Sequence, residues 1–397
     1  MRWTIKPKPD PSKVARLSKE LAVDSTTSFL LAQRGIETFE EAKNFFRPDL
    51  SDLHDPFLMK DMEKAVSRIE EAVENQENIL VYGDYDVDGT TSVALMSSYL
   101  LSFYPNVATY IPDRYEEGYG ISYKGIDFAE DNNFSLIIAL DCGIKAIDKV
   151  AYAFKKEVDF IICDHHRPGA EIPKAKAVLD PKQEDCDYPF KELCGCGVGF
   201  KLIQALASKK GATIDDLVLY LDLVATAIGA DIVPIVGENR ILAYHGLKVI
   251  NENPRPGFEA ILKQVKKEKL TITDVVFIIA PRINAAGRMK HGNHAVTLLC
   301  ETDKNLAAEY AIDIDTYNTD RRDADKRITI EALVQIEENK EQDRFTSVVF
   351  DENWHKGVIG IVASRLTETY YRPTLVFTKS GEMLAASARS VKGFDVY

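Results

Sequence analysis

The sequence lacks any apolar run long enough to span a membrane, and its first residues, MRWTIKPKPDPSK, lack the apolar core of a signal peptide. We therefore expect a soluble, cytoplasmic protein with no membrane partner. Cysteine is scarce, with six in 397 residues, and none forms a C-x-x-C pair, since Cys194 and Cys196 are separated by one glycine. This composition predicts reduced thiols and excludes a zinc-binding cysteine framework.

Positive charge is also in short supply. The chain has 49 lysines and arginines against 62 aspartates and glutamates, which gives a net charge of −13. This balance argues against a protein that coats nucleic acid by bulk charge. It leaves room for a nucleic-acid enzyme, because a few local arginines can hold phosphates and bound cations offset an acidic site.

One acidic stretch follows a strand-like apolar run. Residues 79–91 read ILVYGDYDVDGTT, so Asp84, Asp86 and Asp88 alternate after the run, and a helix is expected from residue 90 to 101. Alternation would place the three carboxylates on one side of an extended turn, where they would repel one another unless a hard cation such as Mg²⁺ or Mn²⁺ binds. The alternative is a solvated acidic turn. The spacing of glycine and glutamate excludes an EF-hand.

Two more apolar runs end in metal-binding residue types. Residues 136–140 precede Asp141, and residues 160–163 precede Asp164, His165 and a second histidine. The carboxyl ends of parallel strands meet at one edge of a sheet, which is where ligands bind in α/β folds. The convergence of these side chains with the first aspartates is what a two-metal hydrolytic site needs.

These stretches resemble a known family. In order, GDYDVDG, LDCG and DHH resemble the motifs of the DHH phosphoesterase superfamily. The later stretches ATAIGADIVP, PRINAAGR, WHKGVIGIVASRL and SARS are similar to its RecJ-type single-strand-specific exonucleases. The resemblance covers roughly residues 55–397. It implies a 5′-to-3′ exonuclease that uses two Mn²⁺ or Mg²⁺ ions, acts on single-stranded DNA with a 5′-phosphate, and serves repair and recombination, with a single-strand-binding protein or a helicase as possible partners.

The resemblance also implies roles for individual residues. The expected metal ligands are Asp86, Asp88, Asp141, His165 and Asp231. The residues expected to assist catalysis are His166, Arg282, Asn284 and Asp84, which lies beside the metal set. The residues expected to contact the substrate are Arg114, Tyr119, Ser387, Arg389 and His355.

Several of these roles have a structural alternative. Arg282 could form a structural salt bridge, His355 could be a surface histidine, and the loop with Arg114 and Tyr119 could be an ordinary crossover turn. Asp164 is expected to orient a histidine, Asp180 to serve in a turn or behind the ligands, and Asp222 is a weaker metal candidate than Asp231. The glycine-rich stretch at 195–206 lacks the Gly-Lys-Ser/Thr ending of a phosphate loop, so its glycines are expected to let a helix approach the sheet.

The pattern of elements predicts an α/β protein with a parallel-sheet DHH phosphoesterase domain. We expect a helical segment packed on that domain at 1–78, the catalytic domain at 79–300, a long linking helix at 301–343 with one break near 318–320, and a partial smaller α/β domain of the DHHA1 type at 344–397. Family members usually continue with a Gly-Gly-His loop and an oligonucleotide-binding barrel, so the chain is expected to be truncated.

Two other functions are compatible with parts of the sequence. A phosphodiesterase for short oligonucleotides or cyclic dinucleotides shares the metal motifs but lacks PRINAAGR and WHKGVIGIVASRL. A non-catalytic scaffold would have lost metal ligands, and here all are present.

Overall fold

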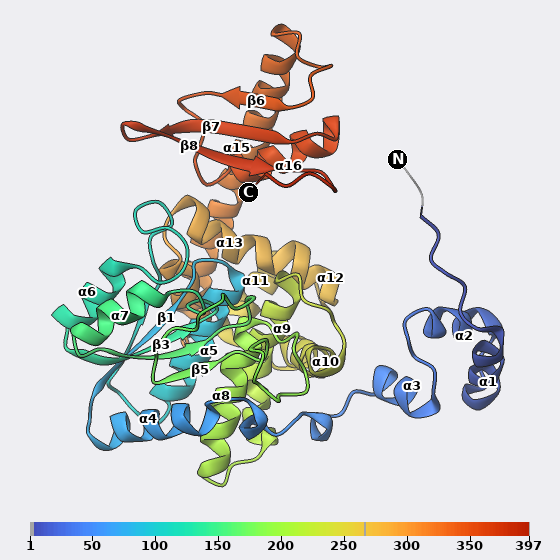
Figure 1. Cartoon of the computed structure of the whole chain (residues 1–397), viewed down its shortest axis with the longest axis vertical. Coiled ribbons are helices and arrows are strands. Elements are labelled where there is room, and N and C mark those ends of the chain that lie inside the picture. The colour runs from blue at the N-terminus through green and yellow to red at the C-terminus, as the bar shows by residue number, and fades with distance from the viewer. Residues whose placement is uncertain (1–3, 266, 397) are drawn as a thin grey trace.

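The computed structural model describes residues 4–265 and 267–396, and its centre is a sheet of five parallel strands (Figure 1). In the spatial order β2-β1-β3-β4-β5, these are β1 (Asn78–Gly83), β2 (Val107–Tyr110), β3 (Phe134–Leu140), β4 (Asp159–Cys163) and β5 (Ala177–Leu179). The three apolar runs of the sequence are β1, β3 and β4, so the predicted parallel α/β sheet is confirmed.

Helices cover both faces of this sheet, as the crossovers between parallel strands require. On one face lie α6 (Tyr123–Asp131) and α7 (Ile147–Lys155). On the other lie α4 (Met62–Glu74), α5 (Val87–Leu101) and α8 (Gly195–Lys209). Further helices extend that second layer: η3 (Ile214–Tyr220), α9 (Leu221–Ala230), α10 (Gly237–Glu252), α11 (Pro256–Val265), α12 (Ile272–Asp274), η4 (Val275–Ile279), α13 (Ala280–Met289) and α14 (Asn293–Cys300).

The strand order reverses at β1, which has β2 on one side and β3 on the other. Crossovers on the two sides of such a point leave in opposite directions and open a crevice at the carboxyl ends of the strands. The acidic stretch after β1 and Asp141 after β3 flank this crevice, so the topology by itself brings two of the predicted motifs together.

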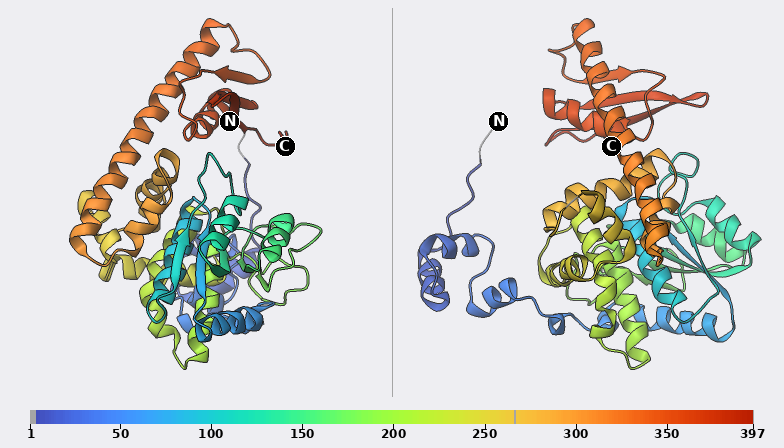
Figure 2. Two further views of the ribbon diagram at one scale, coloured as in Figure 1. Left: turned by 90° about the vertical axis from the view of Figure 1, so that its left-hand side faces the viewer. Right: turned by 180° about the vertical axis from the view of Figure 1, so that it is seen from behind.

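The N-terminal helices only partly follow the prediction. α4 packs on the sheet, whereas α1 (Pro11–Leu21), α2 (Ser25–Ala32) and α3 (Phe39–Phe46) bury their apolar residues in a small core of their own and stand to one side in Figures 1 and 2. Helix α3 begins with a capping box that Thr38 and Glu41 form. Two short turns, η1 (Leu50–Asp52) and η2 (Pro56–Leu58), lead back to the sheet.

A 35-residue helix, α15 (Lys304–Glu338), joins the two halves of the molecule and is about 50 Å long at 1.5 Å per residue. The predicted break near 318–320 is wrong, because no glycine or proline interrupts the helix there. Its first half contributes Ala307 and Ile314 to the core of the sheet unit, and its second half contributes Ile328 and Ile336 to the core of the smaller unit. None of the helices that the structure describes has the length and apolar character to cross a membrane.

The smaller unit contains β6 (Ser347–Phe350), α16 (Ile359–Tyr370), β7 (Thr374–Ser380) and β8 (Met383–Arg389), with β6 parallel and β8 antiparallel to β7. Trp354 anchors it to α15 by donating its indole hydrogen bond to Glu331 over 2.8 Å. Figure 2 shows that α15 holds this unit against the sheet unit at the side of the loop that follows β2. Lys356 reaches that loop at the carbonyl oxygen of Tyr115, 3.5 Å away.

Helix α9 ends at the predicted metal ligand Asp231, and a glycine lets α10 pack close beside it. A Cβ at Gly246 would lie 2.0 Å from the carbonyl oxygen of Leu221 and 2.6 Å from the Cβ of Ala225. We predict that Gly246→Ala lowers the free energy of unfolding by about 1–3 kcal/mol, the usual effect of overpacking, in a urea titration. The control is Gly169→Ala, whose new Cβ would meet only contacts of 3.5 Å or more; equal stability of both variants would contradict the close packing.

Candidate metal centre

The aspartates after β1 are held by the start of a helix and not by an extended turn. Helix α5 begins at Val87, three residues earlier than predicted, so Asp86 is its N-cap and Asp88 lies in its first turn. Asp86 Oδ1 accepts a hydrogen bond from the amide of Gly89 over 3.0 Å. Gly89 is needed for this turn, because a Cβ there would lie 2.4 Å from the carbonyl oxygen of Asp84.

The glycine-rich start of α8 holds the next part of the site. Asp88 accepts hydrogen bonds from the backbone amides of Gly195 and Cys196, both 2.7 Å long, at the positive end of a 15-residue helix. A Cβ at Gly195 would lie 2.6 Å from the Cβ of Asp141. Besides the close helix–sheet packing expected from the sequence, these glycines fix Asp88 and make room for Asp141.

Three of the predicted metal ligands, all aspartates, converge on the imidazole of a fourth, His165. His165 Nε2 lies 3.2 Å from Asp141 Oδ1, 3.6 Å from Asp231 Oδ2 and 3.8 Å from Asp88 Oδ2. Asp141 adopts a left-handed backbone conformation, with φ of 59°, which an aspartate tolerates better than most residues. Two overlapping groups of potential ligand atoms result, Asp88–His165–Asp231 and Asp141–His165–His166.

Asp164 orients the ring of one histidine, His166, as predicted from the sequence, and holds the backbone of the other. Its Oδ1 accepts hydrogen bonds from the amides of His165 and His166 and lies 2.8 Å from the Nδ1 of His166, while its Oδ2 accepts the amide of Ile144. The hydrogen bond to Asp164 raises the pKa of His166 above its usual value. The Nε2 of His166 faces the hydroxyl of Tyr119, 3.5 Å away.

The site concentrates negative charge that the described residues do not neutralise. Both carboxylate oxygens of Asp84 and Asp141, Oδ2 of Asp231 and Nδ1 of His165 are buried without a hydrogen-bond partner among those residues. Burial, and then repulsion from neighbouring aspartates, raises the pKa of Asp84 to about 7 and that of Asp88 to about 8, and raises that of Asp141 well above its normal value. Oxygen-rich, unpartnered and desolvated groups of this kind fit divalent cations such as Mn²⁺ and Mg²⁺.

The weaker metal candidates have other contacts. Asp222 forms a two-pronged ion pair with Arg255, with N–O distances of 2.6 and 2.7 Å. Asp180 is buried and accepts the amide of Lys182 through Oδ1, and burial raises its pKa to about 7. Its Oδ2 is buried without a hydrogen-bond partner among the described residues, so Asp180 fits either predicted role, in a turn or behind the ligands.

Arg282 is not brought to the metal cluster. Its guanidinium lies 2.8 Å from Asp315 of α15 and donates to the carbonyl oxygen of Ile278. Arg282 therefore forms the structural salt bridge that the sequence left open as an alternative. Asn284 lies on the same helix and is half-buried, and within the described residues no hydrogen bond joins its side chain to the cluster.

Three of the five predicted substrate-binding residues, Arg114, Ser387 and Arg389, line a cavity of about 400 Å³ between the two units, which we call the interdomain cleft. Its lining includes Tyr85, Arg114, Arg288, Lys356, Ser387 and Arg389, and no carboxylate of residues 4–265 or 267–396 lines it. The guanidinium carbon of Arg114 lies 4.6 Å from the centre of the Tyr85 ring. The ring of Tyr119 packs nearly perpendicular to the same ring, at 86°. His355 lies next to the cleft, half-buried against Tyr115.

Arg288 is the functional candidate that the sequence analysis missed. It donates to the carbonyl oxygen of Gly357, and burial followed by repulsion from Arg114 and Arg321 lowers its pKa to about 10. It belongs to the PRINAAGR stretch, which forms helix α13. At 100° per residue, Arg282 and Arg288 point about 120° apart, so helical periodicity was the signal that could have separated their roles.

The unneutralised carboxylates predict how stability depends on pH. Asp84 and Asp88 have folded-state pKa values of about 7 and about 8, against about 4 in the unfolded chain. At a pH between the unfolded and folded pKa values, the folded state binds more protons than the unfolded chain. The metal-free protein therefore loses stability as the pH rises through this range.

Thermal unfolding in EDTA at about pH 5.5, 7 and 8.5 should show a falling midpoint, and Mn²⁺ should restore the midpoint most at high pH. Asp88→Asn should flatten the dependence; a metal-free midpoint that rises with pH would contradict this account.

Comparisons with known proteins find related chains. The model of the DHH family, N-terminal domain, matches residues 78–228. The chain is 40% identical, over its whole length, to the single-stranded-DNA-specific exonuclease RecJ of Bacillus subtilis and covers 50% of that protein. It is 34% identical to the Escherichia coli protein of the same name, with 92% of this chain and 66% of that protein aligned. The chain thus spans about half to two thirds of these relatives.

Solved structures share the fold of this chain. A crystal structure of exonuclease RecJ bound to manganese superposes with a TM-score of 0.78 at 30% identity, covering 88% of this chain and 86% of that one. RecJ from Thermus thermophilus in complex with Mn²⁺ superposes with a TM-score of 0.83 at 27% identity, covering 98% of this chain and 55% of that one. With the DHH motifs, the converging aspartates and histidines and this similarity, the chain belongs to the RecJ family of DHH proteins.

Proposed function

We propose that this chain is a metal-dependent exonuclease that hydrolyses phosphodiester bonds of single-stranded DNA from the 5′ end. The observation that carries the proposal is the placement of an acidic metal cluster beside a cleft lined by four cationic side chains and no carboxylate. The relatives' names, which specify single-stranded DNA, support the choice of substrate. As in that family, the enzyme would act in the cytoplasm, in repair and recombination.

The site residues divide into holders of metal and holders of phosphate. Asp86, Asp88, Asp141, His165 and Asp231 would bind two Mn²⁺ or Mg²⁺ ions, with Asp84 beside them. When bound, such cations lower the pKa of an attacking water and neutralise charge on the phosphate. His166 is held by Asp164 with a raised pKa, so it can donate a charged hydrogen bond to the scissile phosphate.

The interdomain cleft suits the end of a strand. Arg288 and Arg389 can hold a 5′-phosphate through charged hydrogen bonds, with Ser387 as a further donor. Tyr119, which is 52% exposed, offers a ring on which the first base can stack. A single strand fits this arrangement because its bases are free to stack, whereas the bases of a duplex are not. We further propose a single-strand-binding protein or a helicase as the source of such strands.

The alternative of a phosphodiesterase for short oligonucleotides or cyclic dinucleotides uses the same metal cluster. It differs in needing no terminal phosphate contact in the smaller unit. The four cations of the cleft, one of which comes from β8, favour the exonuclease.

The first prediction concerns products. A 5′-phosphorylated single strand, labelled at each end in separate reactions with Mn²⁺, should release short products early from the 5′ label only. Asp141→Asn should lower this rate by more than about 100-fold, since loss of groups behind the ligands alone costs about 10–100-fold. The exposed Asp215 provides a matched control as Asp215→Asn. Early products from the 3′ label would overturn the polarity, and activity confined to dinucleotides would favour the alternative.

The second prediction concerns the 5′-phosphate. Arg288→Gln and Arg389→Gln should each reduce the ratio of kcat/KM for 5′-phosphorylated over 5′-hydroxyl strands by about 10-fold, which corresponds to about 1.4 kcal/mol. Arg327→Gln is the control, because Arg327 is an exposed residue of α15 that pairs with Glu331. An unchanged ratio in both cleft variants would remove the phosphate role from the cleft.

A further inference from the structure

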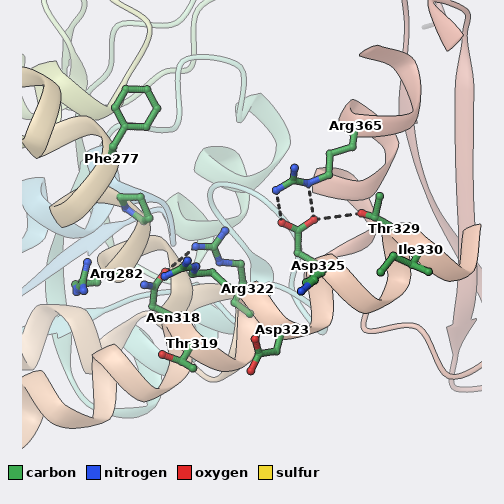
Figure 3. A pocket seen from close by; sticks show the side chains of 13 residues that line it. Phe277, Arg282, Asn318, Thr319, Arg322, Asp323, Asp325, Thr329, Ile330 and Arg365 are labelled. Atoms are coloured by element: carbon green, nitrogen blue, oxygen red, sulfur yellow. Dashed lines mark hydrogen bonds and ion pairs between the residues drawn. The ribbon is translucent and has the colours of Figure 1, made fainter. Parts of the chain in front are cut away.

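A second and larger cavity, of about 880 Å³, lies between η4 and α13, the middle of α15, and α16 (Figure 3). We call it the α15 cavity. Arg282, Arg321, Arg322, Lys326 and Arg365 line it, together with Phe277. None of these residues belongs to the metal cluster or to the interdomain cleft, so the proposed function leaves the α15 cavity without a role.

Two of the five cations are neutralised by the protein. Arg365 binds Asp325 through two hydrogen bonds of 2.8 and 2.7 Å, which are drawn in Figure 3. Arg282 pairs with Asp315. These pairs fix two walls of the α15 cavity, because each joins α15 to a different neighbouring helix.

The other three cations, Arg321, Arg322 and Lys326, form no ion pair within residues 4–265 and 267–396. Asp323 is the one lining carboxylate besides Asp325, so three cations face one unpaired acid in the part of the cavity that the structure describes. Burial and the neighbouring guanidinium groups lower the pKa of Arg321, although Asp325 opposes this shift. An anion between these side chains would relieve their repulsion.

The α15 cavity also has an apolar wall that suits a base. The ring of Phe277 is 73% exposed and the side chain of Ile330 is 53% exposed, although both line a concave surface. Exposed aromatic rings next to guanidinium groups are the usual means of holding single nucleotides and strands, since every base has a face that can stack. The Nε of Arg282, which is buried, has no acceptor in the described chain and provides a further donor.

We propose that the α15 cavity binds a nucleotide, with its phosphate on Arg321, Arg322 and Lys326 and its base against Phe277. The phosphate ester can come from a free 5′-mononucleotide or from a segment of a nucleic-acid strand, and the chemistry of recognition is the same. Arg321 of the α15 cavity lies close enough to Arg288 of the interdomain cleft for the two guanidinium groups to repel each other. Nucleotide binding to the α15 cavity does not rest on the proposed exonuclease activity.

The test uses the whole chain carrying Asp141→Asn, so that strands stay intact, and measures binding by calorimetry. The ligands are 5′-dAMP, deoxyadenosine, inorganic phosphate and a 12-nucleotide deoxyadenosine strand. In this background we compare Arg322→Gln combined with Lys326→Gln, Phe277→Ala, the cleft variant Arg389→Gln, and the control Arg327→Gln. Arg322, Lys326 and Phe277 are exposed, so the variants should fold; equal unfolding midpoints verify this.

The expected result is a loss of affinity of at least about 10-fold for one binding event in the Arg322→Gln/Lys326→Gln and Phe277→Ala proteins, with that event retained in Arg389→Gln and Arg327→Gln. Loss for 5′-dAMP identifies a mononucleotide as the ligand, and loss for the strand alone identifies a strand segment; either supports the proposal. It is overturned if no ligand loses affinity in these variants, or if inorganic phosphate binds as well as 5′-dAMP and Phe277→Ala has no effect.

Discussion

The mutual repulsion of buried carboxylates is the interaction on which the rest of this structure depends. Asp88, Asp141 and Asp231 lie within 4 Å of one imidazole, and few donors in the protein satisfy them. Such a cluster costs folding free energy unless cations bind or protons are taken up. The fold tolerates the carboxylate cluster because rigid elements hold it in place. These elements are the parallel sheet, the amide groups at the start of α8, and glycines at closely packed positions.

Helix α15 imposes the second constraint. Because its two halves are buried in two different cores, it fixes the distance between the metal cluster and the arginines of the smaller unit. The interdomain cleft therefore has walls from both units, with Tyr85 and Arg114 on one side and Ser387 and Arg389 on the other. The same helix presents Arg321 and Arg322 to the α15 cavity, so one element supports two cationic surfaces.

Features that depend on neighbouring residues in the sequence were predicted correctly, and features that depend on other contacts were not. Apolar runs that end in Asp or His predicted β1, β3 and β4 and their common edge, because strand formation and the burial of apolar side chains are local properties. The start of α5 was predicted three residues late, since the backbone amides that make Asp86 a helix cap are not visible as a hydrophobic pattern. The break predicted in α15 was wrong because polar residues alone do not interrupt a helix that is packed at both ends.

Arg282 and Arg288 show most clearly what the sequence alone could not predict. Both are arginines of one short motif, and their chemistry is identical, so residue type could not separate them. Their positions on α13 and the presence of Asp315 on a helix distant in sequence decide that one forms a salt bridge and the other faces the interdomain cleft. By itself, the sequence determined the sheet, the family and the residue types of the metal cluster, because these depend on local pattern. Only the tertiary structure decided which cations remain unpaired, because ion pairing depends on distances between elements that no local pattern contains.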